Sequence, residues 1–193
     1  MPPYRQAVSV GYSMTPEQEI ASPEYWQQNA ERLLYSAQAL VEKLLTIQEF
    51  PAEGDVMIWS NNVRSLLEAN YMLLGFAVEN ALKGYSIYKF ISLNGQLSSS
   101  DLQYLLKSVW KVKNGHDVLS IAENANFQLQ ESEKSLLTKL QEHSIWKGRY
   151  HIPTGLDQIK QSMLPGEKDK YGPVERKVVS DLVQRIGAII REK

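Results

Sequence analysis

The sequence contains no cysteine. This absence excludes disulfide bonds, catalysis by a cysteine thiolate and zinc sites with cysteine ligands. It also fits a reducing compartment. Residues 1–6 (MPPYRQ) lack the apolar run of a signal peptide. We therefore expect a cytoplasmic protein.

The chain also lacks an excess of either charge. Its 193 residues carry 21 Lys and Arg against 22 Asp and Glu, a net charge of -1. Overall charge therefore gives no reason to expect binding to nucleic acid or to a membrane. The distribution is uneven, because residues 147–193 hold 10 basic and 6 acidic side chains. Solvated helix faces explain this pattern most simply, whereas a basic surface patch over residues 147–177 would favour a nucleic-acid ligand.

The common catalytic and cofactor motifs are absent. The sequence has no P-loop, no Rossmann glycine pattern, no His-Glu-x-x-His and no Gly-x-Ser-x-Gly. Its three histidines, His116, His143 and His151, are not spaced as metal ligands. We therefore predict neither a metal nor a cofactor.

Strand-like alternation of useful length is missing as well, and the most hydrophobic segment is helical in its spacing. In residues 63–91 the apolar side chains recur every three or four positions and spread around the helix. Charged residues such as Arg64 and Glu68 interrupt the segment, so it is not a membrane span. The pattern predicts a central helix with other helices packed around it. We expect its N-cap at Asn61 or Asn62 and its end near Ser92.

The rest of the chain shows repeated helix-start signals. Residues 1–21 are predicted to form a loose N-terminal arm, in which Thr15-Pro16-Glu17 signals a short helix. Ser22-Pro23-Glu24 starts an amphipathic helix that Pro51 and Gly54 end. Further helices are expected over residues 99–113 and 118–124, from about residue 131 to Leu140 or Ile145/Trp146, and from Pro173 onward, with a long excursion over residues 154–172. These signals together predict one all-α domain, residues 22–193, built as a bundle of five to seven helices.

A polar cluster lies within the central hydrophobic segment. Glu79 and Lys83 are four residues apart and are expected to pair on one helix face, with Asn80 beside them. Ionisable groups in an apolar helix need partners, because an unpaired buried charge is costly. Two interpretations remain open. The pair is either structural, at the rim of the bundle, or Glu79 orients a His or Arg from another helix.

His116 and Asp117 stand directly before a predicted helix. A histidine at such a junction is either a cap or packing residue, or a general base or ligand contact, since its pKa lies near neutrality. Asp117 is either an ordinary acid of the first helical turn or a member of the same site.

The segment of residues 146–151 is the densest mixture of cationic and aromatic groups in the chain. Arg149 can hold a phosphate through two hydrogen bonds, and Trp146 or Tyr150 can stack on a base, with His151 next to them. The alternative is a simple helix C-terminus, where Lys, Gly and Arg are favoured for dipole and capping reasons.

The order of these motifs resembles the HEPN superfamily. The resemblance rests on Glu79-Asn80-Ala81-Leu82-Lys83 in a buried helix, then Gly115-His116-Asp117-Val118-Leu119, then Gly148-Arg149-Tyr150, then a closing amphipathic helix. It covers about residues 25–192. It implies an up-and-down helical bundle that forms a symmetric dimer. Members include RNA-cleaving toxins, phage-defence and CRISPR-associated ribonucleases, and partner proteins of minimal nucleotidyltransferases.

The nuclease members carry an Arg followed by four to six residues and then a His, and this chain lacks that spacing. The corresponding positions after Arg149 are Thr154, Gly155 and Leu156, and His151 follows Arg149 by only two residues. The resemblance therefore implies an RNA- or nucleotide-associated module of a bacterial defence or toxin–antitoxin type system, acting as a dimer. In that module Arg149 and Lys83 would contact phosphate, and His116 would donate or accept a proton.

Two alternatives remain open beside this hypothesis. One is a non-catalytic protein-interaction bundle, whose polar cluster only locks the helices together. The other is a divergent metal-independent ribonuclease that uses His116 or His151. The partners expected from the resemblance are a second copy of the chain, RNA or a nucleotide, and a protein of the nucleotidyltransferase type; no membrane partner is expected.

Overall fold

The computed structural model describes residues 15–47, 56–110, 116–142 and 173–192. Within these ranges the chain forms seven α-helices, one π-helix and no strand, which confirms the all-α prediction. The elements in order are α1 (Pro16–Ile20), α2 (Pro23–Ile47), α3 (Val56–Asn94), α4 (Ser99–Tyr104), the π-helix η1 (Leu105–Val109), α5 (Val118–Asn124), α6 (Glu131–Glu142) and α8 (Pro173–Arg191).

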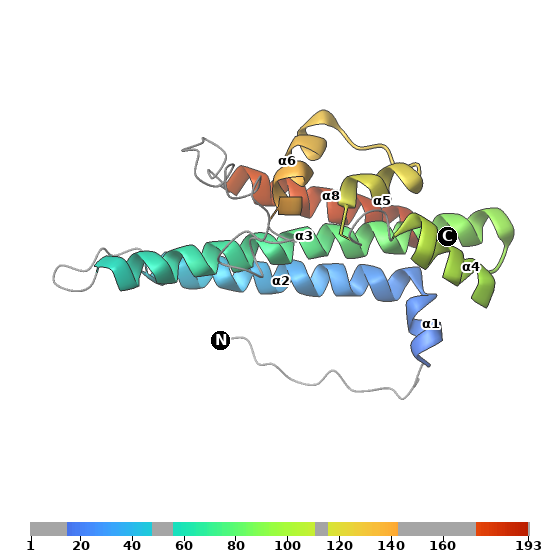
Figure 1. The fold of residues 1–193 in the computed structure, drawn as a ribbon, viewed down its shortest axis with the longest axis horizontal. Helices are drawn as coiled ribbons and strands as arrows, with labels where there is room; N and C mark the ends of the chain where they lie inside the picture. Colours follow the sequence, from blue (N-terminus) through green and yellow to red (C-terminus); the bar gives the residue numbers. More distant parts are fainter. Residues whose placement is uncertain (1–14, 48–55, 111–115, 143–172, 193) are drawn as a thin grey trace.

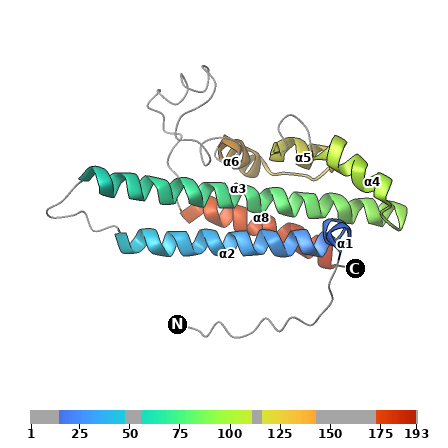
Figure 2. The same ribbon diagram turned by 60° about the horizontal axis from the view of Figure 1, so that its bottom comes forward.

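The longest helix, α3, is the centre of the bundle. It has 39 residues and packs against both α2 and α8, which also contact each other, so the three long helices form a bundle with roughly parallel axes (Figures 1 and 2). The short helices α5 and α6 cover α3 and α8 on one side, while α1 and α4 lie at the same end of the bundle. The prediction of a central hydrophobic helix is therefore confirmed.

Most helix starts follow the predicted capping signals. Thr15 and Ser98 each form a capping box, with Gln18 and Asp101 respectively. Side-chain and backbone hydrogen bonds from Ser98 lower the pKa of Asp101 below its usual value. The end of α3 was predicted two residues early: the helix continues to Asn94 and stops at Gly95, whose φ of +80° suits a glycine.

The predicted N-cap of the central helix at Asn61 or Asn62 is wrong. Helix α3 begins at Val56, so both asparagines lie inside it. A cap preference is worth only about 1 kcal/mol. The segment of residues 56–59, Val-Met-Ile-Trp, is apolar and extends the helix across that signal.

The predicted helix over residues 99–113 is also partly wrong. Its α-helical part ends at Tyr104 and continues as the π-helix η1, in which the amide of Trp110 donates to the carbonyl oxygen of Leu105 at 2.9 Å. The side-chain amide of Asn124 donates to the carbonyl oxygen of Val109 at 3.4 Å. Hydrophobic spacing does not distinguish a π-turn from an α-turn over so few residues. Residues 111–113 lie outside the described ranges.

The described part of the predicted arm is attached to the bundle. Residues 16–20 form α1, and the indole Nε1 of Trp26 on α2 donates to the carbonyl oxygen of Ile20 at 2.8 Å. Residues 1–14, the predicted helix end at Pro51 and Gly54, the end of the helix near Ile145 and the excursion over residues 154–172 lie outside the described ranges.

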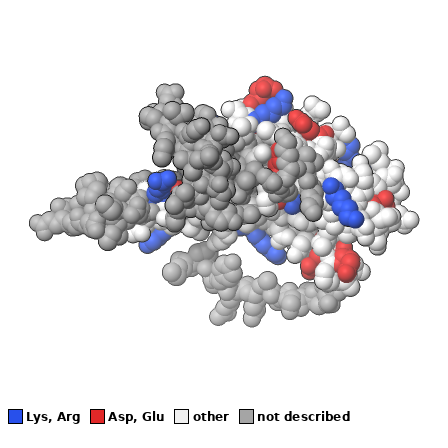
Figure 3. Space-filling view, viewed as in Figure 1, with Lys and Arg blue, Asp and Glu red and all other residues white. Residues whose placement is uncertain are grey.

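Acidic and basic side chains are interspersed on the face in Figure 3, as far as the described atoms show. None of the described helices combines the length and the apolar character needed to cross a membrane.

A partly buried ion pair joins α6 to α8. The carboxylate of Glu133, whose side chain is 7% exposed, accepts hydrogen bonds from Nη2 of Arg185 at 2.7 and 2.8 Å and from the amide of Gln130 at 2.7 Å. The guanidinium of Arg185 also stacks 4.8 Å from the ring centroid of Phe127. This pair therefore caps α6 and holds it against α8.

Replacement of Arg185 by Met is expected to lower the free energy of unfolding by about 2 kcal/mol, because it leaves the Glu133 carboxylate buried without its cation. Urea unfolding followed by circular dichroism measures the change. The matched control is Lys177→Met, which breaks the exposed Lys177–Asp181 pair and should cost less than about 1 kcal/mol. Equal losses in the two variants would contradict the prediction.

Candidate functional site

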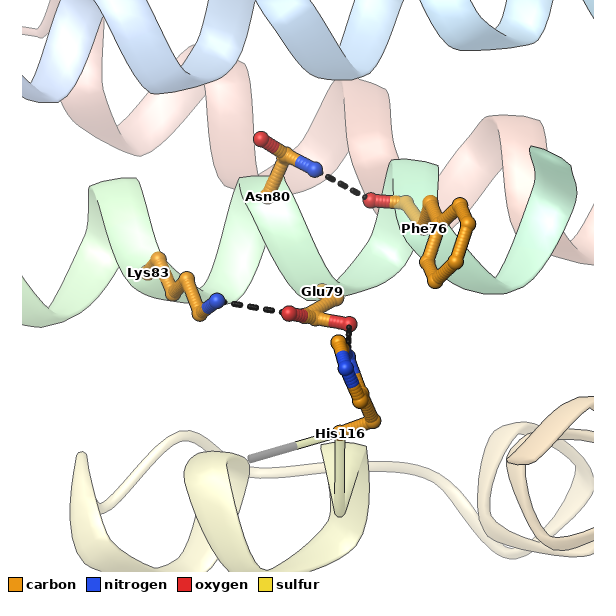
Figure 4. A network of polar contacts seen from close by, with 5 residues as sticks. All are labelled: Phe76, Glu79, Asn80, Lys83 and His116. Atoms are coloured by element: carbon orange, nitrogen blue, oxygen red, sulfur yellow. Dashed lines mark hydrogen bonds and ion pairs between the residues drawn. The ribbon is translucent and has the colours of Figure 1, made fainter. Parts of the chain in front are cut away.

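The carboxylate of Glu79 is the centre of the polar cluster (Figure 4). Its side chain is only 5% exposed. Oε1 lies 2.6 Å from Nζ of Lys83, one helical turn away, and Oε2 lies 2.9 Å from Nδ1 of His116. The expected Glu79–Lys83 pair is thus present. The second partner is a histidine from outside the helix, as one of the two interpretations of the sequence required.

His116 reaches this carboxylate because α5 packs on α3. The two residues are 37 positions apart in the chain, and Asp117 fixes the start of α5 directly after His116. Because the same carboxylate accepts from Lys83, we assign the proton of the second contact to Nδ1 of His116. This contact orients the imidazole in the same way that a carboxylate orients a metal-binding or catalytic histidine.

Lys83 is enclosed by two tryptophans. Its Nζ lies 5.4 Å from the ring centroid of Trp26 and 5.7 Å from that of Trp110, within the range of a cation–π interaction. The two indoles pack edge to face, with centroids 5.3 Å apart. The Lys83 side chain is only 15% exposed, and one carboxylate and two aromatic rings stabilise its charge inside the protein.

The two tryptophans were not predicted as site residues. In the sequence, Trp26 is only the first apolar residue of a predicted amphipathic helix, and Trp110 belongs to none of the motifs described above. They are 84 positions apart, and η1 places Trp110 in the core with 3% exposure. No spacing or motif in the sequence links the two residues. Among the described residues, Nε1 of Trp110 has no hydrogen-bond acceptor, and a bound water would satisfy it.

His116 differs from the other members of the cluster in its exposure. Its side chain is 29% exposed, compared with 5% for Glu79. One side of the ring packs at a tilt against Phe76, with centroids 5.9 Å apart. The imidazole is therefore fixed by Glu79 and Phe76 and still partly accessible to solvent, which suits proton transfer or ligand contact.

Two predicted binding residues do not join this cluster. The amide of Asn80 donates to the carbonyl oxygen of Phe76 at 2.7 Å and points away from Glu79 (Figure 4). Consecutive residues of an α-helix do not face each other, so Asn80 cannot share the direction of Glu79. Asp117 is the N-cap of α5, and its Oδ1 accepts from the amide of Ser120 at 3.0 Å.

The second predicted group of site residues lies outside the described ranges. Trp146, Arg149, Tyr150 and His151 all fall within residues 143–172. The described residues contain no group of three or more His, Asp or Glu side chains able to hold a metal ion.

Comparison of the chain with models of protein families, with curated proteins and with solved structures found no match.

Proposed function

We propose that the chain is a HEPN-like, RNA- or nucleotide-associated module that presents the imidazole of His116 to its ligand. The observation that carries this proposal is the contrast within the cluster: Nδ1 of His116 is held 2.9 Å from a buried carboxylate, whereas 29% of the side chain remains exposed. A purely structural histidine needs no accessible surface, but a histidine that meets a ligand does.

In this proposal Glu79 is the positioning residue. It fixes the tautomer and direction of His116, so that the imidazole donates a hydrogen bond to a phosphate oxygen or exchanges a proton with a ribose hydroxyl. Lys83, which the sequence suggested as a phosphate contact, instead supports Glu79 from within, because its ammonium is engaged by the carboxylate and by the two indoles. In this proposal Arg149 is therefore the residue that contacts phosphate.

The biological setting is part of the same proposal. The motif order that resembles the HEPN superfamily supports a role in a bacterial defence or toxin–antitoxin type system, as a dimer and with a partner of the nucleotidyltransferase type. The all-α arrangement around one long buried helix is compatible with that role.

Binding of RNA and nucleotide tests the proposal directly. We expect the purified chain to bind a fluorescein-labelled single-stranded RNA or ATP, with an affinity that falls as NaCl rises from about 50 to 200 mM. The His116→Gln variant keeps a donor toward Glu79 but loses the imidazole, and should bind about tenfold more weakly, the loss of one charge-assisted hydrogen bond. Fluorescence anisotropy measures both, and a denaturing gel of the same RNA reports any cleavage.

Lys134→Gln is the control, since Lys134 is exposed and already paired with Glu131. It should bind as the wild type does. Absence of binding at low salt, or equal binding by wild type and His116→Gln at equal thermal stability, would refute the proposed role of His116.

A second candidate is a non-catalytic interaction bundle. The observation that favours it is that Glu79 and Lys83 already have partners within the protein: each other, His116, Trp26 and Trp110. If His116→Gln lowers the melting temperature and the wild type binds no RNA or nucleotide, this candidate replaces the first.

A further inference from the structure

A groove with a volume of about 590 Å³ runs between α2 and α8. Its lining includes Leu74 of α3, Leu34 and Tyr35 of α2, and Arg176 and Ser180 of α8. None of its lining residues belongs to the Glu79 cluster.

The shape of the groove follows from the two helices that form it. Arg176 and Arg191 both line it, and fifteen residues of α-helix span about 22 Å. The two walls are long helices lying side by side (Figure 2). The depression is therefore straight and elongated, which suits an α-helix of about 15 residues better than a small rounded ligand.

The two arginines that line the groove differ in their ionic partners. Nη1 of Arg191 is 3.0 Å from Oε1 of Glu31, so that guanidinium already has a carboxylate. Arg176 is half-buried and forms no ion pair with any described residue. A guanidinium held in a partly desolvated wall is best stabilised by a carboxylate, which it binds through two parallel hydrogen bonds.

Two hydrophobic side chains that line the groove, Tyr35 and Leu34, are accessible to solvent. The side chain of Tyr35 is 67% exposed, and Leu34 beside it is half-buried. Tyrosine and arginine are among the residue types that most often dominate the energy of a protein interface. Tyr35 on one wall and Arg176 on the other are therefore suited to anchor a partner.

We propose that the α2–α8 groove binds an amphipathic helical segment of a partner protein. Apolar residues of that segment pack on Leu34 and Tyr35, and an Asp or Glu on its flank pairs with Arg176. The charge of Arg176 selects an acidic flank over a basic one, because a like charge at this position is repelled.

Selection from a peptide library tests this proposal, because the library presents many helical sequences and the groove itself chooses among them. A displayed library of helix-forming peptides of about 16 residues, randomised on one face and its flanks, is selected on the full-length wild-type chain. We expect enrichment of peptides with an apolar stripe and an acidic flank. Anisotropy measurements with the selected peptides should show about tenfold weaker binding to Arg176→Gln and to Tyr35→Ala, with the fold of each variant checked by circular dichroism.

Two control variants make the result specific. Lys177→Gln changes the charge of the neighbouring, exposed residue and should bind the peptides normally. His116→Gln should also bind normally, so failure of the RNA proposal and failure of this one are distinguishable. The proposal is overturned if the library yields no binder, if selected peptides lack acidic residues, or if they bind Arg176→Gln as well as the wild type. It is also overturned if light scattering shows that the wild type is a dimer that Arg176→Gln dissociates, since a second copy would then occupy the groove.

Discussion

Replacement of Glu79 by alanine is expected to lower the free energy of unfolding by about 3–5 kcal/mol, the cost of removing one partner from a buried ion pair. The carboxylate is the shared acceptor of Lys83 and His116, at 2.6 and 2.9 Å, and its side chain is 5% exposed. Without it the Lys83 ammonium remains enclosed by aromatic rings and has no anion. Urea unfolding followed by circular dichroism and tryptophan fluorescence measures the change.

A double replacement serves as the control for this prediction. Glu79→Leu combined with Lys83→Met removes both charges and keeps similar side-chain volumes, so most of the lost stability should return. The same double variant should bind RNA or nucleotide poorly, because His116 has lost the group that orients it. A single variant that loses less than about 1 kcal/mol, or a double variant as unstable as Glu79→Ala, would show that the cluster is not a buried, coupled unit.

Replacement of Gly84 by alanine is expected to destabilise the fold by about 3 kcal/mol, at the upper end of the cost of overpacking a core. A Cβ at this position would lie 2.9 Å from the carbonyl oxygen of Pro23 and 3.1 Å from Cβ of Trp26. Both atoms belong to or sit close to the backbone of α2, so the first turn of that helix must move. Because Trp26 is one of the two indoles around Lys83, the movement should also disturb the cluster.

Gly187→Ala is the comparison for this prediction. There the new Cβ would meet Nε2 and Cδ of Gln27 at 2.5 and 2.9 Å and Nη2 of Arg191 at 3.0 Å, all of them side-chain atoms and none of them backbone. The loss of stability, measured by urea unfolding, should therefore be smaller than at Gly84. An exposed helical Gly→Ala change would itself gain about 1 kcal/mol. An unchanged or higher stability of Gly84→Ala would contradict the close approach of α2 and α3.

Local signals accounted for most of the secondary structure. Thr15-Pro16, Ser98 and Pro173 each mark the start of a helix, because capping and proline preferences act within a single turn. The Glu79–Lys83 pair could also be predicted from the sequence, since residues four apart on a helix are neighbours in any fold. The same local reasoning failed at Asn61 and Asn62, where an apolar run outweighed a cap signal, and at Tyr104, where α4 changes to a π-helix.

The sequence by itself determined the helices of this protein, their apolar faces and the i,i+4 pair on α3, because these depend on interactions within a few residues. The tertiary structure decided which other residues contact that pair. Only the packing of α5 on α3 brings His116 to Glu79, and only α2 and η1 together place Trp26 and Trp110 around Lys83. Contacts between residues 37 or 84 positions apart depend on how helices pack, and no spacing in the chain specifies that.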